Sequence, residues 1–210
     1  MKTPVVCMGV LLFLFMVLPS TRESGLAASR VVTEDYDLYD RIVEVKFLTS
    51  QIQLVLLERL TVARLVPDRA DSMTLKFFQQ EGYFDGELPQ DLVRDFIGAN
   101  QARTRLEERF RFSVRYRFVS EDAEAEREAS ATIPVTNNAR FSGPTPAVLD
   151  RLAFSRVGRT ARNDQALVYV EHVRRDGTGA GFLVWFHRRE QEWVMFDTDV
   201  VWTVGSGVDE

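Results

Sequence analysis

Cysteine is almost missing from this sequence, since the only one, Cys7, lies within the first 27 residues. Lysine is also scarce: only three of the 26 basic residues are lysines, a preference for arginine that suggests a GC-rich bacterial genome. If residues 1–27 are removed, the remaining chain has no disulfide and no thiol nucleophile. A domain of this kind must rely on its hydrophobic core for stability.

The sequence has no apolar run of the length that an ordinary transmembrane helix needs. Its longest run, Val5–Leu18, has fourteen residues, whereas a helix that crosses a bilayer needs about twenty. Lys2 gives a positive start, and Gly25-Leu26-Ala27 places small residues at the −3 and −1 positions of a cleavage site. This layout is typical of a secretory signal peptide, and a permanent anchor is the less favoured alternative.

We therefore expect residues 1–27 to be a cleaved signal and residues 28–210 to form one globular domain. The product would be secreted or periplasmic, and it would contact a membrane only through the signal segment if that segment stayed uncleaved.

The sequence lacks the residues that several classes of function require. The formal net charge of −5 argues against nucleic-acid binding, which needs a basic surface. The sequence has no Gly-x-Gly-x-x-Gly or P-loop motif for a nucleotide. It also has no His-x-x-x-His, Glu-x-x-His or Cys-x-x-Cys spacing for a metal. We expect no cofactor and no metal site.

Hydrophobic spacing predicts the elements of the N-terminal half. Tyr36, Tyr39 and Val43 recur at helical spacing and indicate a helix over 34–48. Further helices are expected over 72–80 and from Pro89 onward. Residues 51–61 favour a strand, with a continued helix as the alternative, while 121–128 favour a short acidic helix and 132–147 a loop.

The clearest strand pattern covers Arg109–Val119, where aromatic residues alternate with arginines. A period of two would place the aromatic side chains on one face and the basic ones on the other. Such a row could bind carboxylates or phosphates, because guanidinium groups form paired hydrogen bonds with both. The alternative is a solvated face neutralised by nearby acids. The candidate anion-binding residues are Arg109, Arg111, Arg115 and Arg117.

The C-terminal third predicts an antiparallel meander. Four strands are expected near 151–158, 165–174, 181–189 and 192–203, with turn residues such as Asp176-Gly177 between them. The expected fold class is α+β, with N-terminal helices packed on an antiparallel sheet that ends in this four-stranded meander. A cone-shaped fold like that of the nuclear-transport-factor-2 group is an architectural alternative by analogy.

Short sequence segments resemble those of a family of uncharacterised, signal-bearing bacterial proteins. They are Leu152–Gly158 (LAFSRVG), Gln165–Val170 (QALVYV), the Gly-x-Gly at Gly179, Trp193 and Trp202, together with Tyr36, Tyr39, Leu54–Leu56, Asp95, Phe96 and Asn100. Members of that family often hold a cysteine pair near the glycine turn, where this chain has Asp176–Gly179. The resemblance implies a shared fold and an extracytoplasmic location, and it implies no activity.

Polar residues of the meander suggest three possible sites. Trp185, His187, Trp193 and Asp197 could line a pocket, although tryptophans in a meander more often belong to the core. A row formed by Ser155, Val168 and His187 would resemble a nucleophile and base, but two strand spacings separate the end members by about 9–10 Å, too far for a nucleophile–base contact.

The acids of the meander give a third possibility, a metal site. Asp197 and Asp199 share one strand face, and Glu171 could lie near them. The adjacent His172 should point to the opposite face from Glu171, so solvent-exposed acids are the favoured interpretation.

The catalytic residues, if any, are unknown at this stage, and whether the chain is an enzyme is uncertain. The leading hypothesis is an exported, non-enzymatic binding or interaction domain of the cell envelope, whose partner is an envelope protein or a small ligand. The alternatives are a pocket-bearing carrier or enzyme and an anion-binding module.

Overall fold

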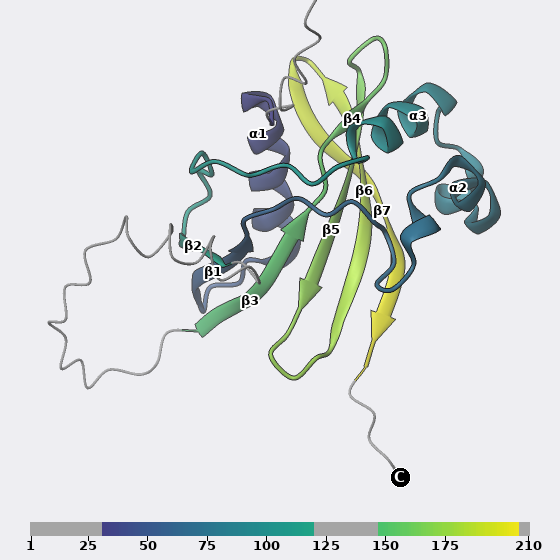
Figure 1. The fold of residues 1–210 in the computed structure, drawn as a ribbon. Coiled ribbons are helices and arrows are strands. Elements are labelled where there is room, and N and C mark those ends of the chain that lie inside the picture. Colours follow the sequence, from purple (N-terminus) through teal and green to yellow (C-terminus); the bar gives the residue numbers. More distant parts are fainter. Residues whose placement is uncertain (1–30, 120–146, 206–210) are drawn as a thin grey trace, which may run out of the picture.

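A mixed seven-stranded sheet with helices on both faces forms the centre of the molecule (Figure 1). The structure is a computed structural model that describes residues 31–119 and 147–205. Its helices are α1 (Thr33–Ile42), which continues as the π-helical turn η1 (Val43–Phe47), then the short 3₁₀ turn η2 (Ala70–Ser72), α2 (Leu75–Glu81), the 3₁₀ turn η3 (Tyr83–Gly86) and α3 (Gln90–Ala99). The strands are β1 (Ile52–Glu58), β2 (Arg115–Val119), β3 (Ala147–Phe154), β4 (Gly158–Arg159), β5 (Gln165–Val173), β6 (Gly179–Arg189) and β7 (Glu192–Val204).

The sheet is not antiparallel throughout, which corrects the sequence-based expectation. Its order is β2-β1-β3-β5-β6-β7, with β4 paired to β5. The C-terminal strands β3, β5, β6 and β7 form the antiparallel meander. β1, however, runs parallel to both β2 and β3. Parallel neighbours need a long crossover, and the segment that contains α2 and α3 supplies it between β1 and β2.

The strand expected over 109–119 is shorter than its alternation suggests, because only Arg115–Val119 pairs with β1. After β1 ends at Glu58, the chain pairs with residues 104–106. The contacts are the antiparallel Leu60–Arg105 bridge and the hydrogen bond from Leu106 N to Arg59 O. Phe110 and Phe112 lie outside the strand, yet both are buried. The expected helix at 121–128 and most of the expected loop at 132–147 lie outside the described residues.

The sheet separates two hydrophobic cores. On one face α1 buries Tyr36, Tyr39 and Ile42 against alternate residues of β5 and β6. The hydroxyl of Tyr39 donates to the carbonyl of Ser155 at 2.9 Å, so this buried phenol is satisfied. On the other face α2, η3 and α3 pack against the intervening residues, including Leu167 and Trp185. β6 is therefore covered on both faces, as its continuous apolar sequence indicates.

Turn chemistry determines the register of the meander. Gly177 adopts a φ of 82° between β5 and β6, and both Glu190 and Gln191 have positive φ between β6 and β7, as expected of tight hairpins. The pairing places Gln165 opposite His187. A simple count through the turn would instead place Val168 opposite His187, a difference of three positions. Because three is odd, His187 lies on the opposite face from Val168, and the row Ser155–Val168–His187 does not form.

Candidate functional site

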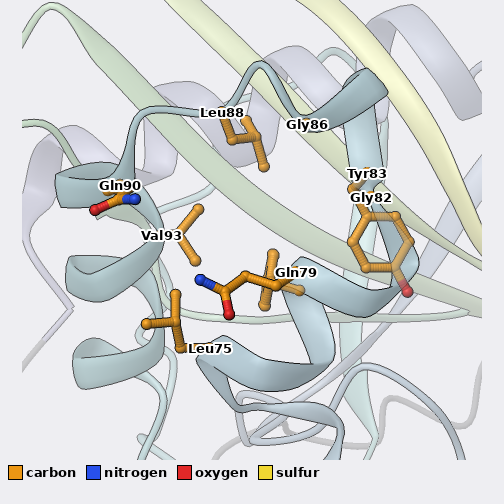
Figure 2. Close-up of a pocket in the computed structure, with 9 residues that line it drawn as sticks. Leu75, Gln79, Gly82, Tyr83, Gly86, Leu88, Gln90 and Val93 are labelled. Atoms are coloured by element: carbon orange, nitrogen blue, oxygen red, sulfur yellow. The ribbon is translucent and has the colours of Figure 1, made fainter.

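A crevice of about 260 Å³ lies between α2, η3 and α3 (Figure 2). Its walls expose polar and apolar surface in about equal parts, the polar part including two glutamine amides. The labelled side chains in Figure 2 show Gln79 extending across the opening between the two helices. The lining residues are Leu75, Phe78, Gln79, Gly82, Tyr83, Gly86, Leu88, Gln90 and Val93.

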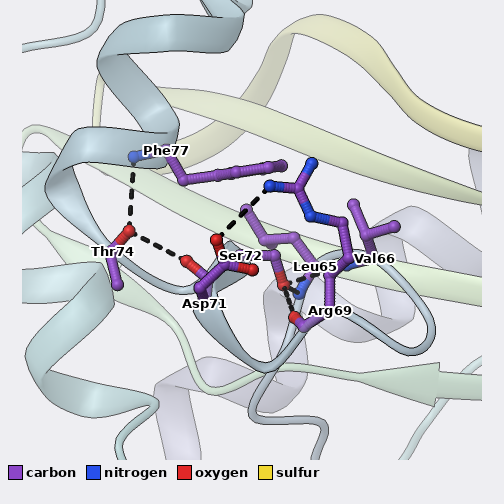
Figure 3. Close-up of polar contacts among 7 residues, drawn as sticks. All are labelled: Leu65, Val66, Arg69, Asp71, Ser72, Thr74 and Phe77. Carbon is purple, nitrogen blue, oxygen red and sulfur yellow. Dashed lines mark hydrogen bonds and ion pairs between the residues drawn. The ribbon is translucent and has the colours of Figure 1, made fainter.

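The wall formed by α2 is fixed by a compact polar turn before the helix (Figure 3). Ser72 Oγ accepts from the backbone N–H groups of Leu65 and Val66 at 2.9 and 3.2 Å, and donates to the carbonyl of Arg69 at 2.6 Å. Thr74 caps the helix, since its hydroxyl accepts from Phe77 N at 3.3 Å. These short-range bonds satisfy a loop that would otherwise leave backbone groups unpaired.

The wall formed by η3 has an unusual backbone. Phe84 and Asp85 have φ values of 54° and 55°, followed by Gly86 at 77°, so three successive residues are left-handed. Each non-glycine residue in this region costs about 1 kcal/mol or more. Two contacts hold the segment in place: Phe84 N donates to Asp199 Oδ2 at 2.9 Å, and the Phe84 ring meets Trp185 edge-on at 5.5 Å.

The wall formed by α3 is held against the sheet. Leu92 and Phe96 are fully buried beneath the helix, and the carboxylates of Asp91 and Asp95 accept from the backbone N–H groups of Ala161 and Arg159. Gly158 of β4 lies directly against the backbone of Phe96. The crevice is thus bounded by elements that are each anchored separately.

The lining is suited to binding rather than to proton transfer. Its polar side chains are two neutral amides and the phenol of Tyr83, whose pKa burial raises above its ordinary value, with the nearby Glu81 and Asp199 carboxylates adding to the rise. No lining group ionises near neutral pH. The Gln79 and Gln90 amides can donate and accept hydrogen bonds, and the leucine, valine and phenylalanine side chains offer apolar contact.

The four residues expected to line a pocket in the meander do not surround one cavity. Trp185 is 5% exposed and packs in the core beneath η3. Trp193 lies on the α1 face, where the guanidinium groups of Arg159 and Arg188 approach its ring. Asp197 is exposed on β7. Only Trp185 and His187 meet, with ring centroids 4.9 Å apart.

His187 is part of an aromatic stack on the α2/α3 face. Its ring lies parallel to that of Phe196, with the centroids 4.0 Å apart. Burial lowers the pKa of His187, and the nearby Arg189 adds to this effect. Ser155 is distant from it in the sheet, and its Oγ accepts from Tyr169 N at 2.8 Å. A nucleophile–base pair between these two residues has no geometric basis here.

The acids that suggested a metal site are also dispersed. Among the described residues, no group of three or more His, Cys, Asp or Glu side chains is placed to hold a metal ion. Asp199 is engaged by Phe84 N. Glu171 accepts from the hydroxyl of Tyr169 at 3.1 Å, while His172 lies on the other face against Phe47.

The four arginines do not form one row. Arg109 bonds to Glu107 and Thr33 outside the strand, and Arg111 lies at a second crevice beside α1. Arg115 and Arg117 remain together on β2, where both are exposed. Within the described part of the chain, neither has an ion pair with a carboxylate.

The second crevice, of about 280 Å³, is lined by Asp37, Asp40, Arg41, Glu44 and Arg111. Asp40 is 8% exposed, and its Oδ2 accepts from Arg111 N at 2.9 Å. Burial, together with the nearby Glu44 and Asp37 carboxylates, raises the pKa of Asp40 to about 6 against the opposing backbone hydrogen bonds. The native protein therefore keeps a proton on Asp40 at a pH where the unfolded chain has lost it.

This pKa gives a testable prediction for stability. The native state binds more protons than the unfolded chain between pH 4 and pH 6, so the contribution of Asp40 to the free energy of unfolding falls as pH rises through that range. Asp40→Asn should remove this loss and raise the stability at pH 7.5 by on the order of 1–2 kcal/mol, with little change at pH 4. Urea unfolding at both pH values measures it.

Asp37→Asn is the matched control, since Asp37 lines the same crevice but is exposed. It should weaken the pH dependence only slightly, because the Asp37 charge is a smaller cause of the raised Asp40 pKa than burial is. Equal stabilisation by both substitutions would show that overall charge, and not the burial of Asp40, is responsible.

Comparison with protein-family models, with curated proteins and with solved structures gave no match for this chain. The resemblance to the signal-bearing bacterial family stays a prediction from the sequence. Among the described residues, no helix has the length and apolar character needed to cross a membrane.

Sequence reasoning missed the α2–α3 crevice, although it predicted both helices. The one local signal was the pair Gly82 and Gly86, which flanks a turn and provides two of its lining residues. The left-handed backbone of Phe84 and Asp85 has no comparable sequence signature, because it depends on Asp199, 115 positions away.

Proposed function

We propose that this chain is a non-enzymatic binding domain of the cell envelope, and that the α2–α3 crevice is its ligand site. The ligand class is a small, mostly apolar molecule with one or two groups that hydrogen-bond to the glutamine amides. The observation that carries this proposal is the lining itself, in which Leu75 of α2 and Val93 of α3 lie on either side of the Gln79 amide.

The strained turn supports the same proposal. A backbone held in rare conformations at Phe84 and Asp85 persists only where the surroundings enforce it, and such sites cluster at ligand-binding positions. The contact between Asp199 and Phe84 N ties this wall of the crevice to the sheet. The crevice would thus be largely preformed, which limits the entropy lost on binding.

Binding of the uncharged fluorescent probe N-phenyl-1-naphthylamine tests the site. Gln79→Trp should fill the opening and weaken the affinity for the probe by about tenfold or more, since it removes the accessible apolar surface. The measurement is a fluorescence titration of the native protein and the variant.

Gln80→Trp is the control, because Gln80 is an exposed neighbour on the same helix that does not line the crevice. It should bind the probe as the native protein does. The proposal fails if the native protein does not bind, or if both variants bind equally well.

The envelope location rests on the sequence of residues 1–27 and has its own test. Expression in a bacterial host, followed by N-terminal sequencing of the periplasmic fraction, should give a chain that begins at Ala28. An unprocessed chain confined to the cytosol would contradict it.

A further inference from the structure

The two edges of the sheet carry opposite charges. β2 forms one edge and β7 the other, and no described strand pairs with the outer side of either. β2 presents Arg115 and Arg117, whereas β7 presents Asp197 and Asp199 and contains no basic residue. An unpaired edge exposes backbone N–H and C=O groups that can accept another strand.

These four charged side chains lie on the same face of the sheet, opposite α1. Arg115 and Arg117 pair in register with Leu54 and Leu56 of β1, whose neighbours Val55 and Leu57 face α1. Asp197 and Asp199 pair with Trp185 and Leu183, which belong to the core beneath α2 and α3. A sheet that continued from one molecule into the next would therefore bring the arginines and aspartates together.

The regular part of β7 is one residue shorter than β2. Two bulges interrupt the pairing of β7 with β6, one on either side of the stretch Asp197–Val200. This stretch contains both aspartates, and β2 has five residues. Within one sheet, β2 and β7 run in opposite directions, so an added copy in the same orientation would pair antiparallel.

We propose that the β7 edge of one molecule binds the β2 edge of a second copy, in an antiparallel register with Arg117 opposite Asp197 and Arg115 opposite Asp199. Opposite charges in directly facing positions stabilise an antiparallel pair. Pairing of β7 with β7 would instead place aspartates opposite aspartates. Pairing of β2 with β2 would place arginines opposite arginines. The contact is therefore head to tail, and it can repeat into short linear assemblies.

The association is weak and depends on salt. The matching stretch is short, and an interface of this size belongs to the transient class. The distance over which salt screens exposed charges is about 3 Å at 1 M salt and about 30 Å at 0.01 M, so attraction between the edges is strong only at low salt. Sedimentation velocity of the purified protein at 10 mM and 500 mM NaCl should show concentration-dependent association at the lower salt only.

Charge exchange identifies the register. Arg117→Glu alone and Asp197→Lys alone should each stay monomeric at 10 mM NaCl, because each places like charges at the pair. The double variant Arg117→Glu/Asp197→Lys should associate again, since every contact between its copies then pairs the glutamate introduced on β2 with the lysine introduced on β7. Asp199 is left unchanged because it also holds Phe84 N.

Arg162→Glu and Glu190→Lys are controls with the same charge changes at exposed turns outside β2 and β7. Both should associate as the native protein does. A native protein that is monomeric at 10 mM NaCl at all concentrations overturns the proposal, as does a double variant that fails to associate. Binding of polyphosphate through Arg115 and Arg117 without self-association would assign these arginines to an anion site instead. Neither outcome bears on the crevice between α2 and α3.

Discussion

Gly158→Ala is expected to lower the free energy of unfolding by about 3 kcal/mol, although it adds only one methyl group. A Cβ at this position would lie 2.7 Å from the backbone nitrogen of Phe96 and closer still to its Cα and Cβ. These atoms belong to α3, so no side-chain rotation can relieve the overlap. The helix would have to move away from β4, to which Asp95 ties it through Arg159 N.

Gly98→Ala provides a control in the same helix with the opposite expected sign. A Cβ at Gly98 would meet nothing within 4 Å, and glycine in a helix costs roughly 0.5–1 kcal/mol relative to alanine. Urea unfolding of both variants therefore compares the same chemical change at two sites. Similar effects from the two substitutions would show that α3 does not pack against Gly158 as described.

The same comparison extends to the proposed site. Because α3 contributes Val93 and Gln90 to the crevice, a displaced helix should also weaken binding of the naphthylamine probe at temperatures where Gly158→Ala remains folded. Gly98→Ala should leave binding unchanged. The pair thus separates loss of the site's shape from a general change in stability.

Local patterns predicted the elements better than their arrangement. The spacing of Tyr36, Tyr39 and Val43 located α1, and the turn residues located the C-terminal hairpins. Alternation of side chains shows which residues share a face of a strand, but it contains no information on strand direction. The parallel pairing of β1 with β2 and β3 could therefore not be deduced, because it depends on the crossover through α2 and α3.

The residues expected to line a pocket in the meander lie apart for a related reason. The face on which His187 lies depends on how many residues the turn between β5 and β6 contains, and an odd change in register reverses it. Trp185 and Trp193 were expected together, but the bulge between Met195 and Asp197 and the alternation of β6 separate them onto different faces. The crevice arises from contacts between distant segments, which no single segment encodes.

Phe110→Ala is expected to have the other large effect, a loss of about 3–5 kcal/mol in the free energy of unfolding. Phe110 is 7% exposed although it lies outside any strand. Its ring centroid is 5.1–6.2 Å from those of six other aromatic residues: Tyr36, Tyr39, Phe112, Tyr116, Phe118 and Phe154. Removing it leaves a cavity between α1 and the sheet that these rings cannot easily fill.

Phe196→Ala tests whether position, and not residue type, causes this loss. Phe196 is 47% exposed and stacks on His187 on the other face of the sheet, so its removal should cost less than about 1 kcal/mol. The two variants are compared by urea unfolding at pH 7.5. If they prove equally destabilising, residues 109–114 do not belong to the core, and the aromatic alternation in this segment would have no packing role. A much larger loss for Phe110 would instead explain why the alternation begins before the first residue of β2. Burial against α1 requires the aromatic residues there even though this segment does not pair with β1.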